Sequence, residues 1–591
     1  MEGFFKGIES INSAVNGVVW GVPMLILIIG TGIYLSVRTG FFQLTGLKHW
    51  LGSTLFAIFR NKSVTKSGEK KAISQFQALT TALAASIGTG NIAGVATAIA
   101  AGGPGAVFWM WVSAFFGMMT SFTENVLGIY YRRKNSKGEW SGGAMYYLEN
   151  GVGAKNGMKL FGRILAVLFA VFCVLASFGI GNMTQANSIS AALESDFGVS
   201  PLLTGLIIAF ISALVIMGGI KRIGAVTEKL VPFMAIFYMA GCLIIFFMNY
   251  GNIPYVFGSI FSSAFDFRAV SGGAGGYIIS RAVTMGFKRG VFSNEAGLGS
   301  SVLVNCASDV REPVKQGMWG IFQVFFDTIV MCTLTAFVLL SSPAKAATME
   351  EAFGSISTEP CYFTLSESEQ DRLIDGECSL IPVITDSNRE RGGYRELPGK
   401  TIYGQEFTLR LREGKGEREE DFTFSNMMKL TGIQGENADG TPMTDEKGNP
   451  VITAVRLEEL NGVPLVTYAF SMRFGDISGK IIAAAVVFFA FSTLIGWSYY
   501  GAKALEYLFG ARSAVVYKGI FVCFIVIGCT MDLRLVWGIS DTLNALMAVP
   551  NLMGVLLLSG TAVKITKNYT ERLRGSRIKP MVSAYNDEKA P

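Results

Sequence analysis

The sequence predicts an all-α polytopic membrane protein that crosses the bilayer eleven times and carries one small β-rich insert outside the membrane. Three observations support this fold class. Half of the 591 residues are hydrophobic and only 16% are charged, which is too little charge for a soluble surface of this size. Apolar runs near twenty residues recur, and a helix needs about 20 to cross a hydrocarbon core of about 30 Å. The net charge of +6 lies in short loops, as in membrane proteins, and does not indicate nucleic-acid binding.

Eleven apolar stretches are long enough to be membrane helices. We predict them at 17–37, 75–99, 106–130, 162–188, 202–220, 229–249, 271–303, 316–341, 480–506, 514–531 and 534–561. The first stretch is long for a signal sequence and lacks a small-residue cleavage site, so it is predicted to be retained. The basic amphipathic segment 38–74 contains an apolar run, 51–59, that is too short to span, and we expect it to lie at the membrane interface. Residues 1–74 therefore form an extra N-terminal helix followed by a cytoplasmic amphipathic segment.

Basic segments predict the orientation. Lys and Arg concentrate at 38–74, 131–160, 220–229 and in the tail 564–591. Eleven crossings place all four on one side, and the positive-inside rule makes that side cytoplasmic. The N-terminus is then outside and the C-terminus inside. The expected location is a bacterial cytoplasmic (inner) membrane.

The insert at 342–478 differs from the rest of the chain because it is polar and charged. Alternating runs at 405–412 and 451–457 predict strands, and the parity of the crossings places the insert outside the cell. Cys361 and Cys378 lie in this oxidising compartment, where a disulfide is expected. Two free thiols are the alternative.

Two predicted membrane helices are interrupted. The first, 75–99, contains Gly-Thr-Gly-Asn at 88–91, and the other, 271–303, contains Gly286, Gly290 and the polar run 292–297. Irregular backbone at membrane depth persists only where protein or a water-lined cavity satisfies it.

Five predicted spans start from each interruption. They form a first repeat, 75–249, and a second repeat with two helices in 250–341 and three in 479–563. Because five is odd, the two repeats are inverted, and paired broken helices mark transport sites. Close packing of helices at the glycines is the alternative.

One long motif carries a family resemblance. Residues 102–117 read GGPGAVFWMWVSAFFG, with GTGNIAGVATAI at 88–99, GNMTQANSI at 181–189 and RGVFSNEAGLGS at 289–300. These stretches resemble the alanine or glycine:cation symporter family over 1–341 and 479–565. The resemblance implies one extra helix before a ten-helix leucine-transporter-type 5+5 inverted repeat. It also implies sodium-driven uptake of alanine or glycine, coupled to protons in some members.

The chain departs from this family in two places. The 342–478 insert is much longer than the family's usual loop, so the resemblance says nothing about its role. After Gly299 the sequence reads SSVLVNCASD, where members often carry Ser-Ala-Pro followed by His and alanines. The second departure bears on the details of the second broken helix and on substrate choice.

The first interruption is the predicted substrate site. Backbone N–H groups freed at Thr89 and Gly90, at the start of the half-helix 91–98, can bind a carboxylate with help from the helix dipole. The resemblance assigns Gln185 and Phe292 to the same pocket. Bonding between helices is the alternative for Gln185, and ordinary core packing is the alternative for Phe292.

The predicted sodium site rests on hydroxyl and carbonyl oxygens. Similarity to the leucine-transporter fold pairs Ser492 and Thr493 with the carbonyls of Ala84 and Ile87. The alternative is that both hydroxyls bond their own helix. Asn91 either serves a second sodium or caps the opened helix.

Three carboxylates lie inside predicted spans, where ionisable residues are functional candidates. For Glu124 we favour a structural role. Asp327 and Glu295 either take part in coupling or pair with Arg281 or Lys288, and the sequence leaves both possibilities open.

These patterns predict a sodium-coupled symporter that imports small neutral amino acids, alanine or glycine, by alternating access. The coupling ion is Na+, with H+ as a possibility, and the oligomeric state stays open. The alternative is a membrane receptor or sensor that binds the amino acid in the same pocket. An enzyme is not expected, because the sole histidine, His49, offers no catalytic set or proton relay and no nucleotide loop is present.

Overall fold

The computed structural model describes residues 12, 14–17, 19–265, 274–341, 361–364, 378–382, 394–401, 406–413, 428–434, 452–459, 462–475, 477–531 and 534–585. Only the backbone is described at 274–281, 472 and 534–537 and in the strands between 361 and 459.

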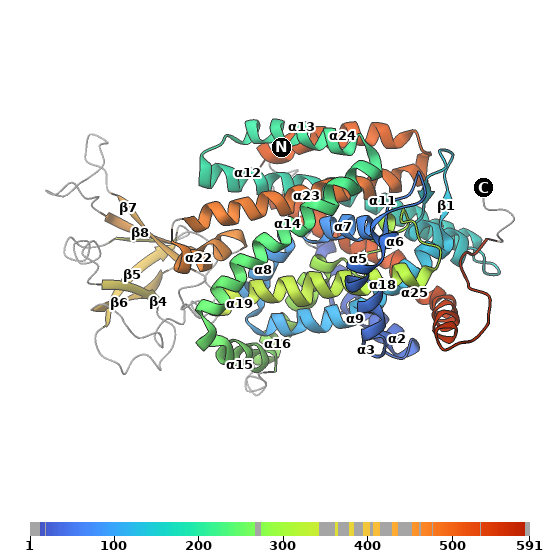
Figure 1. The fold of residues 1–591 in the computed structure, drawn as a ribbon. Helices are drawn as coiled ribbons and strands as arrows, with labels where there is room; N and C mark the ends of the chain where they lie inside the picture. Colours follow the sequence, from blue (N-terminus) through green and yellow to red (C-terminus); the bar gives the residue numbers. More distant parts are fainter. Residues whose placement is uncertain are drawn as a thin grey trace.

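The first half of the chain is helical apart from one hairpin (Figure 1). Its elements are α2 (Val22–Arg38), α3 (Phe42–Thr45), α4 (Leu47–Ser53), α5 (Leu55–Arg60), α6 (Lys62–Thr65), α7 (Gln75–Ser86), the π-helix η1 (Gly90–Gly94), α8 (Val95–Gly102), α9 (Gly105–Tyr131), β1 (Arg133–Lys134), β2 (Trp140–Ser141), α10 (Ala144–Tyr147), the π-helix η2 (Leu148–Val152), α11 (Lys159–Phe178), the π-helix η3 (Gly179–Met183), α12 (Thr184–Phe197), α13 (Pro201–Ile216), α14 (Gly219–Met248), the 3-10 turn η4 (Tyr250–Asn252) and α15 (Ile253–Ala264).

The second half adds further helices and a sheet. Its elements are α16 (Ala274–Asn294), α17 (Val302–Asn305), α18 (Pro313–Val324), the π-helix η6 (Phe325–Cys332), α19 (Thr333–Ser341), β3 (Cys361–Thr364), β4 (Cys378–Pro382), β5 (Tyr394–Thr401), β6 (Glu406–Glu413), β7 (Met428–Gln434), β8 (Ile452–Glu459), α22 (Val463–Phe474), α23 (Ile477–Phe509), α24 (Ser513–Thr530) and α25 (Arg534–Leu573).

Long apolar helices confirm a multi-pass helical membrane protein. Within the described residues, seven helices are long and apolar enough to cross a bilayer, and α7 with α8 makes an eighth if the bent pair is one span. Two shorter apolar helices, α2 and α13, lie below that length. The number of eleven crossings therefore stays a prediction.

Two neighbouring helices carry many exposed apolar side chains. Helices α13 and α14 expose Leu202, Leu206, Phe210, Phe233, Ile236 and Phe247, each by more than 45%. A contiguous exposed apolar surface of this kind is rare on a soluble monomer and marks contact with lipid or another protein.

Two local predictions are wrong. The first is the basic loop at 220–229, because α14 begins at Gly219 and runs through these residues. The chain turns at Met217 and Gly218 instead, and the charged residues occupy exposed first turns of the helix.

The second correction concerns the glycines of the second interrupted span. Helix α16 is continuous through Gly286 and Gly290, which do not break it. A Cβ at Gly286 would lie 2.5 Å from the Ala106 carbonyl oxygen, and one at Gly290 would lie 3.1 Å from Ser113. Both glycines therefore allow α16 to pack closely against α9, which is the alternative that the sequence left open.

The insert contains a six-stranded antiparallel sheet in the order β4-β6-β5-β3-β8-β7. Figure 1 places this sheet beyond α22, at the opposite end of the helices from β1 and the C-terminus. The side chains of Cys361 and Cys378 lie outside the described ones. Their strands, β3 and β4, are separated by β5 and β6, and three strand spacings amount to about 14 Å, whereas a disulfide needs Cα atoms within about 7 Å. This order argues against the expected bridge.

A short backbone bridge joins the segment before α7 to the segment after α17. The Ile73 N–H donates to the Ala307 carbonyl at 3.1 Å, and the Ile73 carbonyl accepts from the Asp309 N–H at 2.7 Å. The two interrupted helices are thus tied together at the end that carries β1 and β2.

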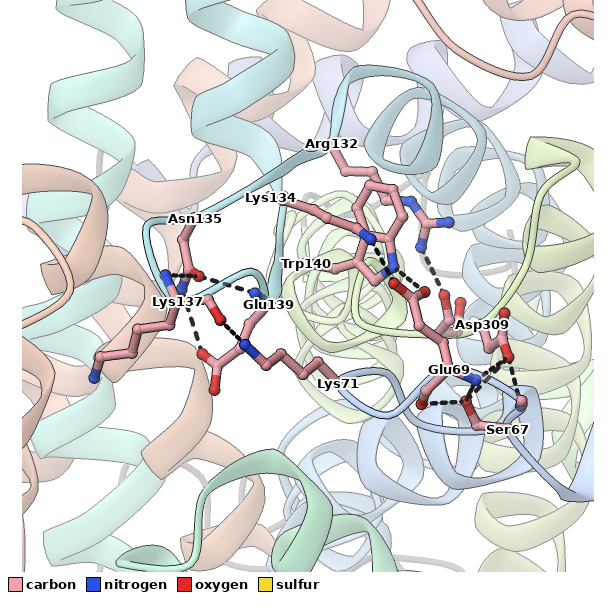
Figure 2. Close-up of polar contacts among 12 residues, drawn as sticks. Ser67, Glu69, Lys71, Arg132, Lys134, Asn135, Lys137, Glu139, Trp140 and Asp309 are labelled. Carbon is pink, nitrogen blue, oxygen red and sulfur yellow. Dashed lines mark hydrogen bonds and ion pairs between the residues drawn. The ribbon is translucent and has the colours of Figure 1, made fainter. Parts of the chain in front are cut away.

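A polar network surrounds this bridge (Figure 2). Glu69 accepts hydrogen bonds from Lys134 Nζ at 2.6 Å and from Trp140 Nε1 at 2.8 Å. The Asp309 carboxylate accepts from the Gly68 N–H at 2.8 Å. The β1–β2 hairpin is therefore fastened to the segment before α7, which Asp309 joins to the segment after α17.

Candidate functional site

The first broken helix opens between Ser86 and Gly90. The two helical parts are bent by 54°. The Gly88 N–H donates to Asn91 Oδ1 at 3.1 Å, so the Asn91 side chain caps the opened turn. Gly88 has no room for a side chain, because a Cβ there would collide with Thr493 Oγ1. The chain leaves the α-helix where the sequence places Gly-Thr-Gly-Asn.

A cavity of about 370 Å³ lies against this break. Three of its lining residues, Thr89, Gly90 and Phe292, are predicted substrate residues. The cavity is also lined by Ala93, Gly94, Thr97, Arg289 and Gly462. Thr89 precedes the π-helical turn η1 and Gly90 begins it, at a helix start where the first N–H groups lack intrahelical acceptors. The arrangement can therefore bind an anionic group of a small ligand.

Gln185 lies behind this surface rather than on it. Its Nε2 donates to the Ile180 carbonyl at 2.9 Å, within the irregular turn η3 that leads into α12. Its Oε1 accepts from Thr89 Oγ1 at 3.4 Å. The side chain is buried, and it is not among the lining residues of the cavity. Gln185 thus links α12 to the break and contacts one of the predicted substrate residues.

The predicted sodium ligands meet in part. Ser492 Oγ approaches the Ala84 carbonyl at 3.3 Å and bonds the Phe489 carbonyl of its own helix at 2.8 Å. Thr493 Oγ1 bonds the same Phe489 carbonyl at 3.0 Å and lies against Gly88. No side chain in the described part of the chain donates to the Ile87 carbonyl. Both hydroxyls therefore show back-bonding, and Ser492 also reaches the broken helix.

Asn91 connects three helices around a buried carboxylate. Its Nδ2 donates to Ser293 Oγ at 3.0 Å and to Asp327 Oδ1 at 3.0 Å. Asp327 Oδ2 accepts from Ser293 Oγ at 2.7 Å and from Thr328 Oγ1 at 3.0 Å. Asn91, Ser293, Asp327 and Thr328 are all fully buried. Sequence reasoning singled out Asp327 and Asn91 separately, and only the fold shows that they touch.

None of the three membrane carboxylates pairs with Lys288. That lysine forms an ion pair with Asp541 at 2.7 Å, so the pairing offered as an alternative for Lys288 is wrong. The side chain of Arg281 lies outside the described ones.

Neutral groups contact the other two membrane carboxylates. Glu124 accepts a hydrogen bond from Asn551 Nδ2. Glu295 accepts from Ser300 Oγ at 2.6 Å. Among the described residues, neither carboxylate forms an ion pair.

Arg289 was not identified from the sequence. It lines the cavity one helical turn before Phe292, and its guanidinium carbon lies 5.6 Å from the centre of the Phe292 ring. The sequence contained a signal that could have identified Arg289. A basic residue three positions before a predicted pocket residue lies on the same face of the helix.

Comparisons with known proteins identify the family of this chain. A family model described as "Sodium:alanine symporter family" matches residues 5–361 and 450–583. The sodium/alanine symporter AgcS of Methanococcus maripaludis is 41% identical over 562 residues, which are 95% of this chain and 97% of that protein. The amino-acid carrier protein AlsT of Bacillus subtilis is 29% identical, covering 99% of this chain and 96% of its own.

A solved structure of the Eremococcus coleocola manganese transporter aligns over 86% of this chain and 78% of its own. The TM-score is 0.39 and the identity is 12%, which is too low to support an argument about the fold. The family match covers the motifs at 88–99, 102–117, 181–189 and 289–300 and confirms the resemblance that they predict. The chain belongs to the sodium:alanine symporter family.

Proposed function

We propose that this protein imports alanine or glycine together with sodium by alternating access. Family membership makes the protein a symporter of amino acids in a membrane and not an enzyme. The observation that carries the finer proposal is the cavity at the break of the first interrupted helix. Its volume is about 370 Å³, and its lining includes Phe292 and the helix-start residues Thr89 and Gly90.

The substrate proposal follows from the chemistry of a zwitterion. Its carboxylate binds the N–H groups of Thr89 and Gly90, whose orientation at a helix start favours an anion. The hydroxyl of Thr89 lies beside this position and provides an oxygen acceptor for an ammonium group, and Gln185 Oε1 supports it from behind by accepting its proton. Phe292 lies against Gly90, since a Cβ there would be 3.3 Å from the ring, and it limits the space for the substrate side chain.

The sodium proposal uses the oxygen atoms around Ser492. We assign the ion to the carbonyls of Ala84 and Ile87 with the hydroxyls of Ser492 and Thr493, because Na+ prefers oxygen ligands. Support comes from the approach of Ser492 to Ala84 and of Thr493 to Gly88. Binding of the ion would exchange the bonds of both hydroxyls to their own helix for bonds to sodium.

A second ion is proposed at Asn91 and Asp327. A fully buried carboxylate with only neutral hydrogen-bond donors is costly unless a cation joins it. Na+ or H+ would supply that charge, so this cluster is where coupling to either ion would arise.

The topology proposal places the N-terminus outside and the C-terminus in the cytoplasm, with two inverted five-helix repeats. The separation of the insert from β1 and the C-terminus in Figure 1 supports opposite sides for these parts. The insert would then be extracytoplasmic.

A receptor that binds an amino acid without moving it is the second candidate. The relatives do not favour it, because they are named as a symporter and a carrier. Purified protein in liposomes distinguishes the two, because an inward sodium gradient should drive accumulation of labelled alanine. Binding without accumulation would support the receptor.

Variants at the break test the carboxylate assignment. Thr89→Trp and Gly90→Trp should abolish alanine uptake while the protein elutes as a folded species, because a large side chain fills the cavity floor. Unimpaired uptake by both variants would remove this assignment.

A further inference from the structure

The cavity extends beyond the proposed carboxylate position. Its lining follows the first broken helix from Gly90 to Thr97, and seven residues of helix rise by roughly 10 Å. This length exceeds that of one alanine or glycine molecule. Gly462, which directly precedes α22, lies at the side that faces the insert. The cavity therefore has room for a second position between its floor and that side.

Arg289 is the charged residue of the lining. The other lining residues are Gly, Ala, Thr and Phe. Its position one turn before Phe292 places the guanidinium above the ring, farther from the break than Phe292 itself. A cation over an aromatic face is stabilised only modestly, by about 0.5–2 kcal/mol.

The charge of Arg289 has no acidic counterpart among the described residues. The neighbouring Lys288 pairs with Asp541, and the carboxylate of Asp327 accepts hydrogen bonds from Asn91, Ser293 and Thr328. Arg289 Nε is buried and has no hydrogen-bond partner in the described structure. A guanidinium that lines a cavity in this way can bind an anionic group of a ligand.

We propose that Arg289 is a substrate-binding residue that holds the carboxylate of the incoming amino acid before it reaches the N–H groups of Thr89 and Gly90. This inference rests on the proposed function, since it assigns a first position to the same substrate. A guanidinium matches a carboxylate through two parallel hydrogen bonds, which a lysine cannot reproduce. Phe292 lies between the two positions and separates capture from the final site.

Transport by reconstituted Arg289→Gln and Arg289→Lys tests the proposal. Loss of a charged hydrogen-bonding group should raise KM for alanine by about 10- to 100-fold in Arg289→Gln. The rate at saturating alanine should change by less than about threefold, because the final site is intact. Arg289→Lys should lie between the wild type and Arg289→Gln.

Two alanine derivatives provide a second readout. N-acetylalanine keeps the carboxylate and lacks the ammonium, whereas alaninamide keeps the ammonium and lacks the carboxylate. N-acetylalanine should compete with alanine uptake in the wild type and lose at least tenfold of its potency in Arg289→Gln. Competition by alaninamide should be the same in both proteins.

Arg473→Gln is the matched control. Arg473 is an arginine of α22 that donates to Asn249 and lies outside the cavity lining. Its KM for alanine should stay at the wild-type value. If KM for alanine rises equally in Arg473→Gln, removal of any positive charge at this end of the helices has the same effect. That result would overturn the assignment of Arg289 to the substrate carboxylate.

The remaining outcomes are also decisive. If Arg289→Gln has an unchanged KM for alanine and an unchanged N-acetylalanine potency, the inference about Arg289 is overturned. The proposed function still holds in that case, provided that the wild type accumulates alanine. Wild-type liposomes that accumulate no alanine overturn the proposed function and this inference together. If Arg289→Gln does not fold, Arg289→Lys tests the proposal in its place. A wild-type KM for alanine together with a wild-type potency of N-acetylalanine in Arg289→Lys would reject the bidentate contact.

Discussion

The two broken helices of this protein look alike in sequence and differ in construction. The first opens without left-handed residues, since Ile87 has φ −75° and Thr89 has φ −59°. The second opens after α16 through Glu295, Gly297 and Gly299, whose φ angles are 59°, 92° and 73°. The first break is shaped by neighbouring side chains, whereas the second is built into its own backbone.

The backbone groups of the two breaks also have different partners. At the second break, Asn294 Oδ1 accepts from the Ala296 N–H at 2.9 Å, and Asn551 Nδ2 donates to the Gly297 carbonyl at 2.8 Å. The first break instead presents Thr89 and Gly90 to the cavity, which residues 295–299 do not line. The comparison teaches that the first break borders a cavity, whereas the second is packed against protein groups.

Gly88→Val should have the largest effect. Its side chain would collide with the Thr493 hydroxyl at the proposed sodium site and force the first break to move. We expect alanine uptake to fall at least 100-fold, measured in liposomes with an inward sodium gradient. Gly30→Val is the control, because Gly30 is exposed on α2 with nothing within 4 Å of an added Cβ. Wild-type uptake by Gly88→Val would show that the first break tolerates a side chain and has no ligand-directed geometry.

Gly299→Ala should affect stability more than substrate binding. A left-handed non-glycine residue costs about 1–3 kcal/mol, and the added Cβ would lie 2.6 Å from Asn551 Oδ1. We expect a lower Tm and an unchanged KM for alanine in the protein that remains folded. Gly198→Ala has the same backbone cost at φ 66° but open space around it, so its smaller Tm loss isolates the effect of crowding. A changed KM with wild-type Tm would assign the second break to the ligand.

Ser492→Ala combined with Thr493→Ala should weaken the response to sodium. Two hydroxyl ligands at about 1 kcal/mol each correspond to a shift of roughly tenfold or more in the sodium concentration for half-maximal uptake. Uptake at saturating sodium should recover. A sodium titration that matches the wild type would place the ion elsewhere, with Asn91 and Asp327 as the next position to test.

The position of the first break was predictable because Gly-Thr-Gly-Asn inside an apolar membrane helix is costly unless the backbone opens there. For Gly286 and Gly290, the sequence could not distinguish a helix break from close helix packing, because both favour glycine. The polar run at 292–297 did indicate the second opening, because α16 ends at Asn294, and the left-handed backbone at Glu295, Gly297 and Gly299 defines its course.

The cluster around Asp327 could not be predicted from the sequence, for a different reason. Asn91, Ser293 and Asp327 lie on three separate helices, and their contact depends on tertiary packing. The irregular turns η3 and η6 leave hydropathy unchanged, and the sequence analysis did not predict them. The helical class and the family were predictable because they rest on composition and on contiguous motifs.

The smallest expected effect tests the connection between the two breaks. Glu69 belongs to the network around the Ile73 bridge, which joins the segment before the first broken helix to the segment after the second. Burial acts to raise the pKa of the Glu69 carboxyl, but hydrogen bonds from Lys134 and Trp140 outweigh it, and the pKa is lowered from 4.5. Its stabilising contribution is therefore present above pH 4.5 and is lost as the pH falls through the lowered pKa.

Glu69→Gln should remove this pH dependence. At pH 7 we expect a loss of only about 0.2–1 kcal/mol, because the pair with Lys134 is partly exposed. Below pH 4.5 the Tm of the wild type should approach that of Glu69→Gln. If both breaks depend on this connection, the variant should also raise the rate of alanine exchange across liposomes. If the Tm curves of the two proteins stay parallel from pH 7 to pH 3, Glu69 does not stabilise the junction, which then depends on the Ile73 backbone bridge and the Asp309 hydrogen bonds.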